Sequence, residues 1–278
     1  MRLSLCNEVL RDWPLSRQCA FAAAVGYDGL EIAPFTLADD PTGLTERDAQ
    51  TVRATVEDAG LTVTGLHWLL LAPKGLSITA TDPDTVSRTQ ATLDRLIDLC
   101  AALGGTVLVH GSPLQRRLPE GDAAATGRAH DQALHHLGRA GARAGAAGIT
   151  YCLEPLSAAE ANFVTSVAEA VDVIETVGEP ALKTMIDTSA AGQMEALALP
   201  ALIDRWLPTG HIAHIQLNDR NRRGPGEGED RFAPILSALL RHGWDRPIAV
   251  EPFVYDPDGP ACAARCAGYL RGLGEALA

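Results

Sequence analysis

The sequence predicts an α/β protein built as a single (β/α)8 TIM barrel that spans residues 1–278. Three observations lead to this prediction. Eight short runs with β-strand character alternate with amphipathic segments of helical period. The runs are almost continuously apolar, as expected for parallel strands that are covered on both faces. The 278 residues are 46% apolar, and no linker-like stretch marks a second domain, so one large core is expected.

The predicted strands are spaced so that each leaves room for one helix. They lie at residues 2–6, 29–33, 61–67, 106–111, 149–154, 183–187, 212–217 and 247–251. The first run, RLSLC, is followed by Asn7 and Glu8, which interrupt it too early for a secretion signal. We therefore interpret it as the first strand of the barrel.

The predicted helices lie between these strands. Seven are expected at residues 15–26, 45–60, 86–105, 129–148, 166–178, 232–243 and 262–278. Most of these segments end in glycine, which is a common residue at the C-terminal end of a helix. One more segment, 195–208, contains Pro200, so the sequence does not define where that helix starts.

Composition excludes several classes of function. The net charge of −12 disfavours binding to nucleic acid, which requires a basic surface. No apolar run approaches the roughly 20 residues of a membrane span. The sequence lacks a glycine-rich phosphate loop, and GPGEG is too acidic to bind a nucleotide, so we expect no nucleotide cofactor. A Gly-x-Ser-x-Gly elbow for a serine hydrolase is also missing.

Six scattered cysteines indicate reduced, buried thiols and a cytoplasmic protein rather than a disulfide framework. Cys262 and Cys266 are four residues apart in the last helical segment, a spacing that could bind metal. Because neither a second pair nor a histidine lies nearby in the sequence, we expect them to pack as helix residues.

Chemically competent side chains lie at or near the ends of seven predicted strands. In strand order they are Glu31, His67, His110, Glu154, Asp187, Gln216 and Glu251. A single polar residue at a strand end commonly marks the transition to solvent. Seven of them converge, however, because active sites of such barrels form at the C-terminal ends of the strands.

The last four strands place three carboxylates and one carboxamide next to each other, namely Glu154, Asp187, Gln216 and Glu251. Carboxylates packed closely raise one another's pKa unless a cation neutralises them. Oxygen ligands suit Mg²⁺ or Mn²⁺, and a set that includes histidine also suits Co²⁺ or Zn²⁺. We therefore expect one divalent metal ion, with Asp187 among its ligands.

Four stretches carry a resemblance to a known family. They are LEPLSAAEANF at 153–163, MIDTSAAG at 185–192, HIQLNDRNRRGPGEGE at 214–229 and IAVEPF at 248–253. At their spacing, almost the whole chain resembles the xylose isomerase-like sugar phosphate isomerase/epimerase superfamily. The ketose 3-epimerases match these stretches best, while hydroxypyruvate isomerases and inosose-processing enzymes share the same frame.

The resemblance implies roles for particular residues. Glu154, Asp187, Gln216 and Glu251 would be the metal ligands, and Glu160 and Arg222 would contact the sugar substrate. Two positions depart from the epimerases. Gln216 stands where the epimerases carry histidine, and hydroxypyruvate isomerases resemble this chain in having glutamine there. Ala190 stands where the epimerases carry a histidine that holds the substrate. The second departure suggests a different or bulkier substrate.

The expected reaction removes a proton next to a carbonyl and forms an enediolate. Glu154 and Glu251, on strands 5 and 8, would act from opposite faces of the substrate as acid and base. The same arrangement would support elimination from a keto-inositol or a 3-keto-glycoside, and the sequence does not separate these outcomes. The expected enzyme is therefore a metal-dependent sugar isomerase or epimerase, or alternatively a dehydratase or lyase.

Other candidate residues carry alternative interpretations. His67 is a candidate for substrate contact, and Trp68, which follows it, either forms a wall of the pocket or belongs to the core. His110 binds substrate, orients a ligand or is structural, and Glu31 is the remaining candidate for substrate contact. Arg222 suits an oxyanion or a hydroxyl of the substrate, although one or more arginines of this loop are expected to face solvent. Homo-oligomers occur in the family, but no feature of the chain indicates one.

Two further hypotheses compete with a sugar enzyme. The endonuclease IV family shares this barrel, and His67, His110, Glu154, Asp187 and Glu251 resemble part of its zinc set. Ala190 and Gln216 stand where that family has histidines, and the −12 charge opposes phosphate-backbone binding. A barrel without metal or activity is the other hypothesis, and the acids at the strand ends argue against it.

Overall fold

The computed structural model describes residues 1–277, which form a closed barrel of eight parallel strands in sequence order. The strands are β1 (Leu3–Cys6), β2 (Gly29–Ile32), β3 (Thr62–Leu66), β4 (Val107–His110), β5 (Thr150–Leu153), β6 (Leu182–Asp187), β7 (Ile212–Leu217) and β8 (Ile248–Val250). β1 pairs with both β2 and β8, which closes the ring. All eight predicted strands and the (β/α)8 fold class are confirmed.

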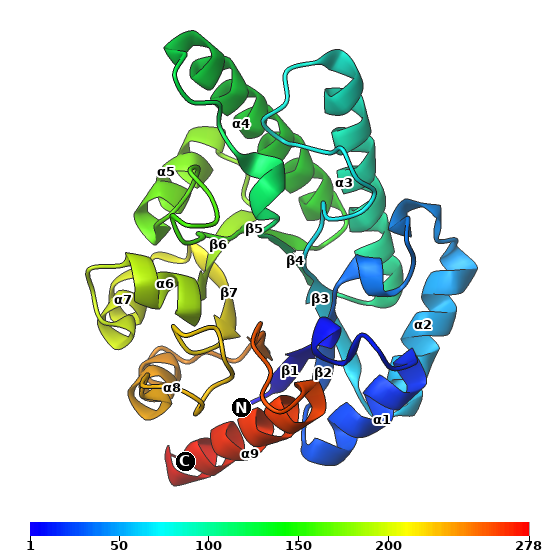
Figure 1. Ribbon diagram of the computed structural model, residues 1–278, viewed down its shortest axis with the longest axis vertical. Coiled ribbons are helices and arrows are strands. Elements are labelled where there is room, and N and C mark those ends of the chain that lie inside the picture. Colours follow the sequence, from blue (N-terminus) through cyan, green and yellow to red (C-terminus); the bar gives the residue numbers. More distant parts are fainter. Residues whose placement is uncertain (278) are drawn as a thin grey trace.

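Helices surround the ring of strands (Figure 1). The α-helices are α1 (Leu15–Val25), α2 (Glu46–Asp58), α3 (Pro83–Leu103), α4 (Ala123–Ala146), α5 (Val167–Val177), α6 (Thr188–Met194), α7 (Leu199–Trp206), α8 (Phe232–Arg241) and α9 (Gly259–Leu277). Short 3-10 helices are η1 (Asn7–Leu10), η2 (Pro34–Thr36), η3 (Pro41–Gly43), η4 (Pro113–Arg116) and η5 (Leu207–Thr209). They lie in the connections between strands and α-helices.

The segment predicted as a helix at 195–208 contains α7 and runs into η5, and a separate helix, α6, lies directly before it. Helix α6 begins directly after β6, and Asp187 caps it by accepting a hydrogen bond from the Ala190 N–H at 2.7 Å. Glu195 then adopts an extended conformation and ends α6. Pro200 lies in the first turn of α7, where a missing N–H costs nothing, so it starts a helix rather than interrupting one.

The main core lies between the strands and the helices, as the apolar pattern predicts. A separate apolar cluster consists of strand residues alone, and its members are Val107, Val109, Cys152, Met185 and Ala213. Polar side chains occupy further buried positions on the strands, for example the hydroxyls of Ser4 and Thr64, which lie 2.8 Å apart. Because all strands run in parallel, the residues that follow them collect at one rim.

Two other predictions can be compared with the described residues. All six cysteines are buried and free of disulfides, as predicted. Within residues 1–277, the structure contains no helix with the length and apolar character that crossing a membrane requires.

Gly65 provides a test of how tightly the strands pack. It pairs in register with Val107 of β4, and a Cβ at this position would lie 2.4 Å from the Val107 carbonyl oxygen. We expect Gly65→Ala to lower the free energy of unfolding by about 1–3 kcal/mol, the usual cost of overpacking. Urea denaturation measures this. Gly127→Ala is the control, because its Cβ meets open space on α4 and should leave stability equal or slightly higher.

Candidate active site

Three carboxylates meet at the C-terminal rim of the barrel. Glu154 directly follows β5, Asp187 is the last residue of β6, and Glu251 directly follows β8. One ligand atom from each lies within 4.8 Å of the others, and all three residues are buried. Strand ends that are far apart in sequence therefore bring three acids to one point.

Local structure sets the direction of each acid. Capping of α6 occupies Oδ1 of Asp187 and leaves its Oδ2 buried without a hydrogen-bond partner. Glu154 lies against Gly111, where a Cβ would be 2.3 Å from Glu154 Oε2, so only glycine leaves space for this carboxylate. The main chain of Glu251 is fixed by Asn218, whose Nδ2 donates to the Glu251 carbonyl at 2.8 Å.

Burial is the largest cause of the raised pKa values of these acids. It raises the pKa of Asp187 to about 7 and that of Glu251 to about 8. Burial also raises the pKa of Glu154 well above its usual value, and the charges of Glu251 and Asp187 add to this effect. Without a cation, these side chains therefore hold protons at neutral pH.

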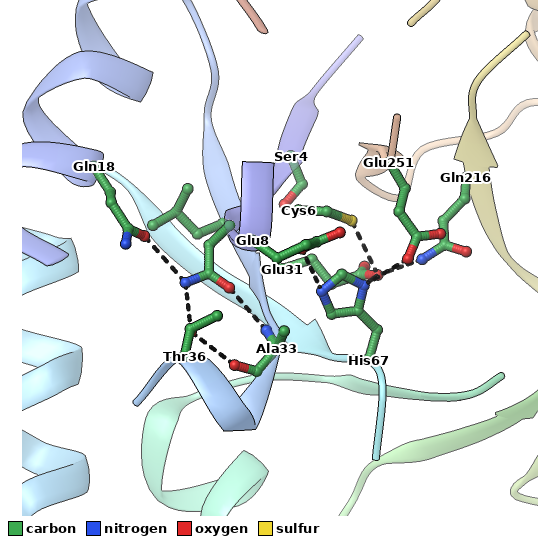
Figure 2. A network of polar contacts seen from close by, with 12 residues as sticks. Ser4, Cys6, Glu8, Gln18, Glu31, Ala33, Thr36, His67, Gln216 and Glu251 are labelled. Carbon is green, nitrogen blue, oxygen red and sulfur yellow. Dashed lines mark hydrogen bonds and ion pairs between the residues drawn. The ribbon is translucent and has the colours of Figure 1, made fainter. Parts of the chain in front are cut away.

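Glu31 is the centre of a buried polar network that includes His67 and Gln216 (Figure 2). Its Oε1 accepts a hydrogen bond from Gln216 Nε2 at 2.8 Å, and its Oε2 lies 2.9 Å from His214 Nε2. Burial opposes ionisation of Glu31, but His214 together with His67 and Gln216 holds its pKa at about 2. The amide nitrogen of Gln216 is thus used by Glu31. The amide oxygen of Gln216 is buried and has no hydrogen-bond partner.

His67 links this network to Glu251 (Figure 2). Its Nδ1 lies 3.1 Å from Glu251 Oε1, and its Nε2 lies 3.0 Å from Glu8 Oε2. Burial would lower the pKa of His67, but the charges of Glu8 and Glu251 and its hydrogen bonds to them raise it well above the usual value. The imidazole thus holds the carboxylate of Glu251 in one position.

The three acids line a cavity that opens at the rim. Trp68 and Phe253 form one wall, with their rings 6.4 Å apart in an edge-to-face arrangement. The guanidinium of Arg222 lies 4.8 Å from the centre of the Phe253 ring and 3.5 Å from Glu160 Oε1. The carbonyl of Arg222 also accepts hydrogen bonds from the N–H groups of Phe253 and Val254, both at 2.9 Å.

Seven of the predicted site residues line this cavity. They are His67, Trp68, Glu154, Glu160, Asp187, Arg222 and Glu251. Glu31 and His110 do not line it, and the expectation that they contact substrate stays a prediction. Both side chains are fully buried, and His110 Nδ1 lies 2.6 Å from the Tyr151 hydroxyl. Burial lowers the pKa of His110 to about 3, so its ring is neutral.

Sequence reasoning missed several residues that hold the site. Arg116 is completely buried, and its guanidinium donates to the carbonyls of Glu154 at 2.6 Å and Val164 at 3.1 Å. Glu8 lies in the 3-10 helix η1, directly after the predicted strand 2–6, and it was not considered as a site residue. A signal for Glu8 existed, because the first strand was the one strand end without a candidate residue. Arg116 lies in a connection between strand and helix, where the sequence gives no such signal.

Ala190 lines the cavity on the side of β6, as do Ser189 and Gln193. Gln193 Nε2 donates to Ser189 Oγ at 3.1 Å and to the Arg220 carbonyl at 3.3 Å. The small side chain of Ala190 therefore fills little of this side of the cavity. The amide of Gln193 is already held by Ser189 and Arg220.

The donor set suits a divalent cation. Asp187 Oδ2 and Gln216 Oε1 are buried oxygens without partners, and Asp187 and Gln216 pair in register between β6 and β7. Together with Glu154 and Glu251 they would offer an oxygen-rich set, as Mg²⁺ and Mn²⁺ prefer. Gln216 itself does not line the cavity, which is consistent with a position below its floor.

The fold and the cavity define this chain as a (β/α)8 barrel with a site made of acids at its C-terminal rim. A family model described as xylose isomerase-like TIM barrel matches residues 19–272. The chain therefore belongs to the xylose isomerase-like TIM barrel family, which confirms the resemblance inferred from its strand-end motifs.

Individual relatives within this family are distant. A ketose 3-epimerase from Arthrobacter globiformis is 26% identical over 231 residues, which cover 81% of this chain and 74% of that protein. A D-psicose 3-epimerase from Clostridium cellulolyticum H10, solved with D-tagatose, has a TM-score of 0.81 at 19% identity, covering 100% and 99% of the two chains. A 3-keto-D-glucoside 4-epimerase from E. coli has a TM-score of 0.76 at 17% identity, covering 93% and 94%.

The raised pKa values predict how pH affects the metal-free protein. Asp187 and Glu251 bind protons more tightly when folded, so folding takes up protons and stability falls as pH rises from 6.5 to 8. The raised pKa of His67 acts in the same direction. Each group contributes at most about 1.4 kcal/mol per pH unit. Denaturation in EDTA measures the fall, and saturating Mn²⁺ should remove it. A stability that rises over this range would contradict the assignment.

Glu31→Gln tests whether the network around Glu31 orients Gln216. The variant keeps the shape of the side chain but loses the charge that pairs with His214, so the Gln216 amide is free to turn. We expect Mn²⁺ affinity, measured by calorimetry, to fall about 10–100-fold, as for other residues that support metal ligands. Glu46→Gln, on the exposed first turn of α2, is the control and should bind as the unmodified protein does.

Proposed function

We propose that this protein is a metal-dependent epimerase or isomerase that acts on a ketose or a related keto-sugar. The observation that carries the proposal is the meeting of Glu154, Asp187 and Glu251 within 4.8 Å at the base of an open cavity. The relatedness to ketose 3-epimerases along 81% of the chain supports it. Such sugars carry a C–H bond next to a carbonyl, which two well-placed carboxyl groups can activate.

A divalent cation bound by Glu154, Asp187, Gln216 and Glu251 would stabilise the negative charge that develops on the substrate oxygens when the proton leaves. The all-oxygen set favours Mn²⁺ or Mg²⁺ over Zn²⁺. Its four members come from consecutive strands, β5 to β8, so each reaches the site from a different direction.

Proton transfer is assigned to Glu154 and Glu251. One of them takes the proton from the carbon next to the carbonyl in its ionised form, and the other returns a proton in its neutral form. Burial raises the pKa of both toward neutrality or above, which favours exchange of protons with carbon acids. His67 holds Glu251 by its Nδ1 at 3.1 Å and thereby fixes the acceptor oxygen.

Substrate recognition is assigned to the wall of the cavity. Arg222 and Glu160 face each other at 3.5 Å and offer charged hydrogen-bond donors and acceptors to sugar hydroxyls. Trp68 and Phe253 supply an apolar surface for the C–H face of a sugar ring or chain. These groups together suit a polyhydroxylated ligand of modest size.

The open side at Ala190 bears on the choice of substrate. A 3-keto-glycoside is larger than a simple ketose, and the shape of the chain is also similar to that of a 3-keto-D-glucoside 4-epimerase. Ala190 beside the cavity favours this second class of substrate, for which either epimerisation or elimination would begin with the same proton. A nuclease activity is disfavoured, because the −12 charge opposes a polyanion.

The proposal is tested by proton exchange in D₂O. The protein is incubated with Mn²⁺ and, in turn, with ketoses, keto-inositols, 3-keto-glycosides and hydroxypyruvate, and NMR follows deuterium entering next to the carbonyl. We expect Glu154→Gln and Glu251→Gln to lower the exchange rate at least 10²-fold, the usual worth of an acid or base. Glu46→Gln, on the surface of α2, is the control. Exchange at the unmodified rate in either active-site variant would exclude that residue as acid or base.

A further inference from the structure

Two cysteines and a glutamate meet away from the cavity, between α9 and the turn that follows Arg223. Cys262 Sγ lies 4.0 Å from Cys266 Sγ and 2.9 Å from Glu227 Oε2. One ligand atom from each of the three residues lies within 4.8 Å of the others. Both cysteines are fully buried, and the side chain of Glu227 is 9% exposed. The cysteines were expected to serve helix packing alone, and the fold adds a carboxylate that the sequence spacing did not reveal.

The spacing of these atoms fits a tetrahedral metal centre. With metal–sulfur bonds of about 2.3 Å and metal–oxygen bonds of about 2.0 Å, the ligand atoms should be roughly 3.8 Å (S to S) and 3.5 Å (S to O) apart. The two sulfurs already have nearly this separation at 4.0 Å. The carboxylate oxygen needs to withdraw by only about half an ångström from Cys262, so side-chain rotation suffices.

Charge and surroundings support a bound cation. Two thiolates and a carboxylate carry three negative charges, of which a divalent cation offsets two. Arg265 offsets the third, since its guanidinium donates to Glu227 Oε1 and to the Asp256 carbonyl. The Gly224 N–H donates to Glu227 Oε2 at 3.1 Å, so both oxygens of the carboxylate are oriented, as is common for ligands of structural metals.

The backbone of the turn packs closely against the two sulfurs. A Cβ on Gly224 would lie 2.1 Å from Cys266 Sγ and 3.1 Å from Cys262 Sγ, so the turn approaches the thiols in a way that only glycine permits. Pro225 and Gly226 complete the turn that carries Glu227. A hydrogen-bonded acid beside two thiols at this distance is a convergent donor set rather than ordinary helix packing.

We propose that Cys262, Cys266 and Glu227 bind one thiophilic divalent cation of the Zn²⁺ class, with water as the fourth ligand. On binding, each thiol releases its proton to solvent and the sulfur forms a bond to the cation, so no oxidant or reductant is needed. The cation ties the turn 224–228 to α9. This turn belongs to the same connection as Arg222, so the site fixes one wall of the cavity without touching the substrate.

The test uses Co²⁺ as the probe in the metal-free chain of 278 residues. Thiolate ligands give Co²⁺ an intense charge-transfer absorption in the near ultraviolet, which oxygen ligands do not. The titration is done in the Glu154→Gln, Asp187→Asn variant, so that the acids at the rim are weakened as competitors. We expect the absorption to saturate at about one Co²⁺ per chain and to disappear when Zn²⁺ is added, because Zn²⁺ prefers this ligand set.

Matched variants identify the ligands. Cys262→Ser and Cys266→Ser should each reduce the absorption at least twofold, and Glu227→Gln should weaken Co²⁺ binding at least tenfold. Cys100→Ser is the control, because Cys100 is equally buried but bonds to the Val107 carbonyl and lies in α3. It should leave the absorption unchanged.

A measurement on the unmodified chain covers the case in which a serine variant fails to fold. Alkylation with mapping by mass spectrometry should show Zn²⁺ slowing the reaction of Cys262 and Cys266 at least tenfold. The proposal is overturned if the parent chain gives no near-ultraviolet absorption with Co²⁺, or if the absorption is undiminished in both serine variants. It is also overturned if Zn²⁺ does not protect the two cysteines. None of these outcomes affects the D₂O exchange test of the rim acids.

Discussion

Five buried carboxylates lie close to one another or to His67 at one end of this barrel, and their mutual repulsion is the constraint on which the rest of the site depends. They are Glu8, Glu31, Glu154, Asp187 and Glu251. The structure separates them into two layers. Glu31 is ionised in the lower layer because His214 and His67 lie beside it, whereas the acids of the upper layer have raised pKa values. The upper layer would thus accommodate a cation, and the lower layer supports the upper one through the contact of His67 with Glu251.

The two layers have different physical roles. In the lower layer Glu31 lies within hydrogen-bond distance of Gln216 and His214, which fix its position. In the upper layer Asp187 Oδ2 has none, and the adjoining amide oxygen of Gln216 is also unpaired. Unpaired buried oxygens destabilise the folded chain unless a ligand satisfies them. The unpaired oxygens thus lower the stability of the ligand-free fold and would raise its affinity for a ligand that satisfies them. Such a trade-off is usual at functional sites.

Much of this arrangement could be predicted from the sequence. Parallel strands must end at a common rim, so residues at strand ends such as Glu154, Asp187 and Glu251 were expected to meet. What the pattern could not supply is depth. Glu31 lies within β2 and His110 is the last residue of β4, yet both side chains are fully buried and neither lines the cavity. Contacts from loops, such as those of Arg116, depend on turns whose direction has no periodic signal.

The main chain of Arg222 has a consequence for how this protein can change over generations. Its carbonyl accepts from the N–H groups of Phe253 and Val254, two and three residues beyond Glu251. The connections after β7 and β8 are therefore joined by two main-chain hydrogen bonds close to Glu251. Lengthening either loop would displace Glu251 along with the substrate grip, so new specificity should arise by exchange of single side chains. Positions such as Ala190, outside these connections, are where such exchanges are tolerated.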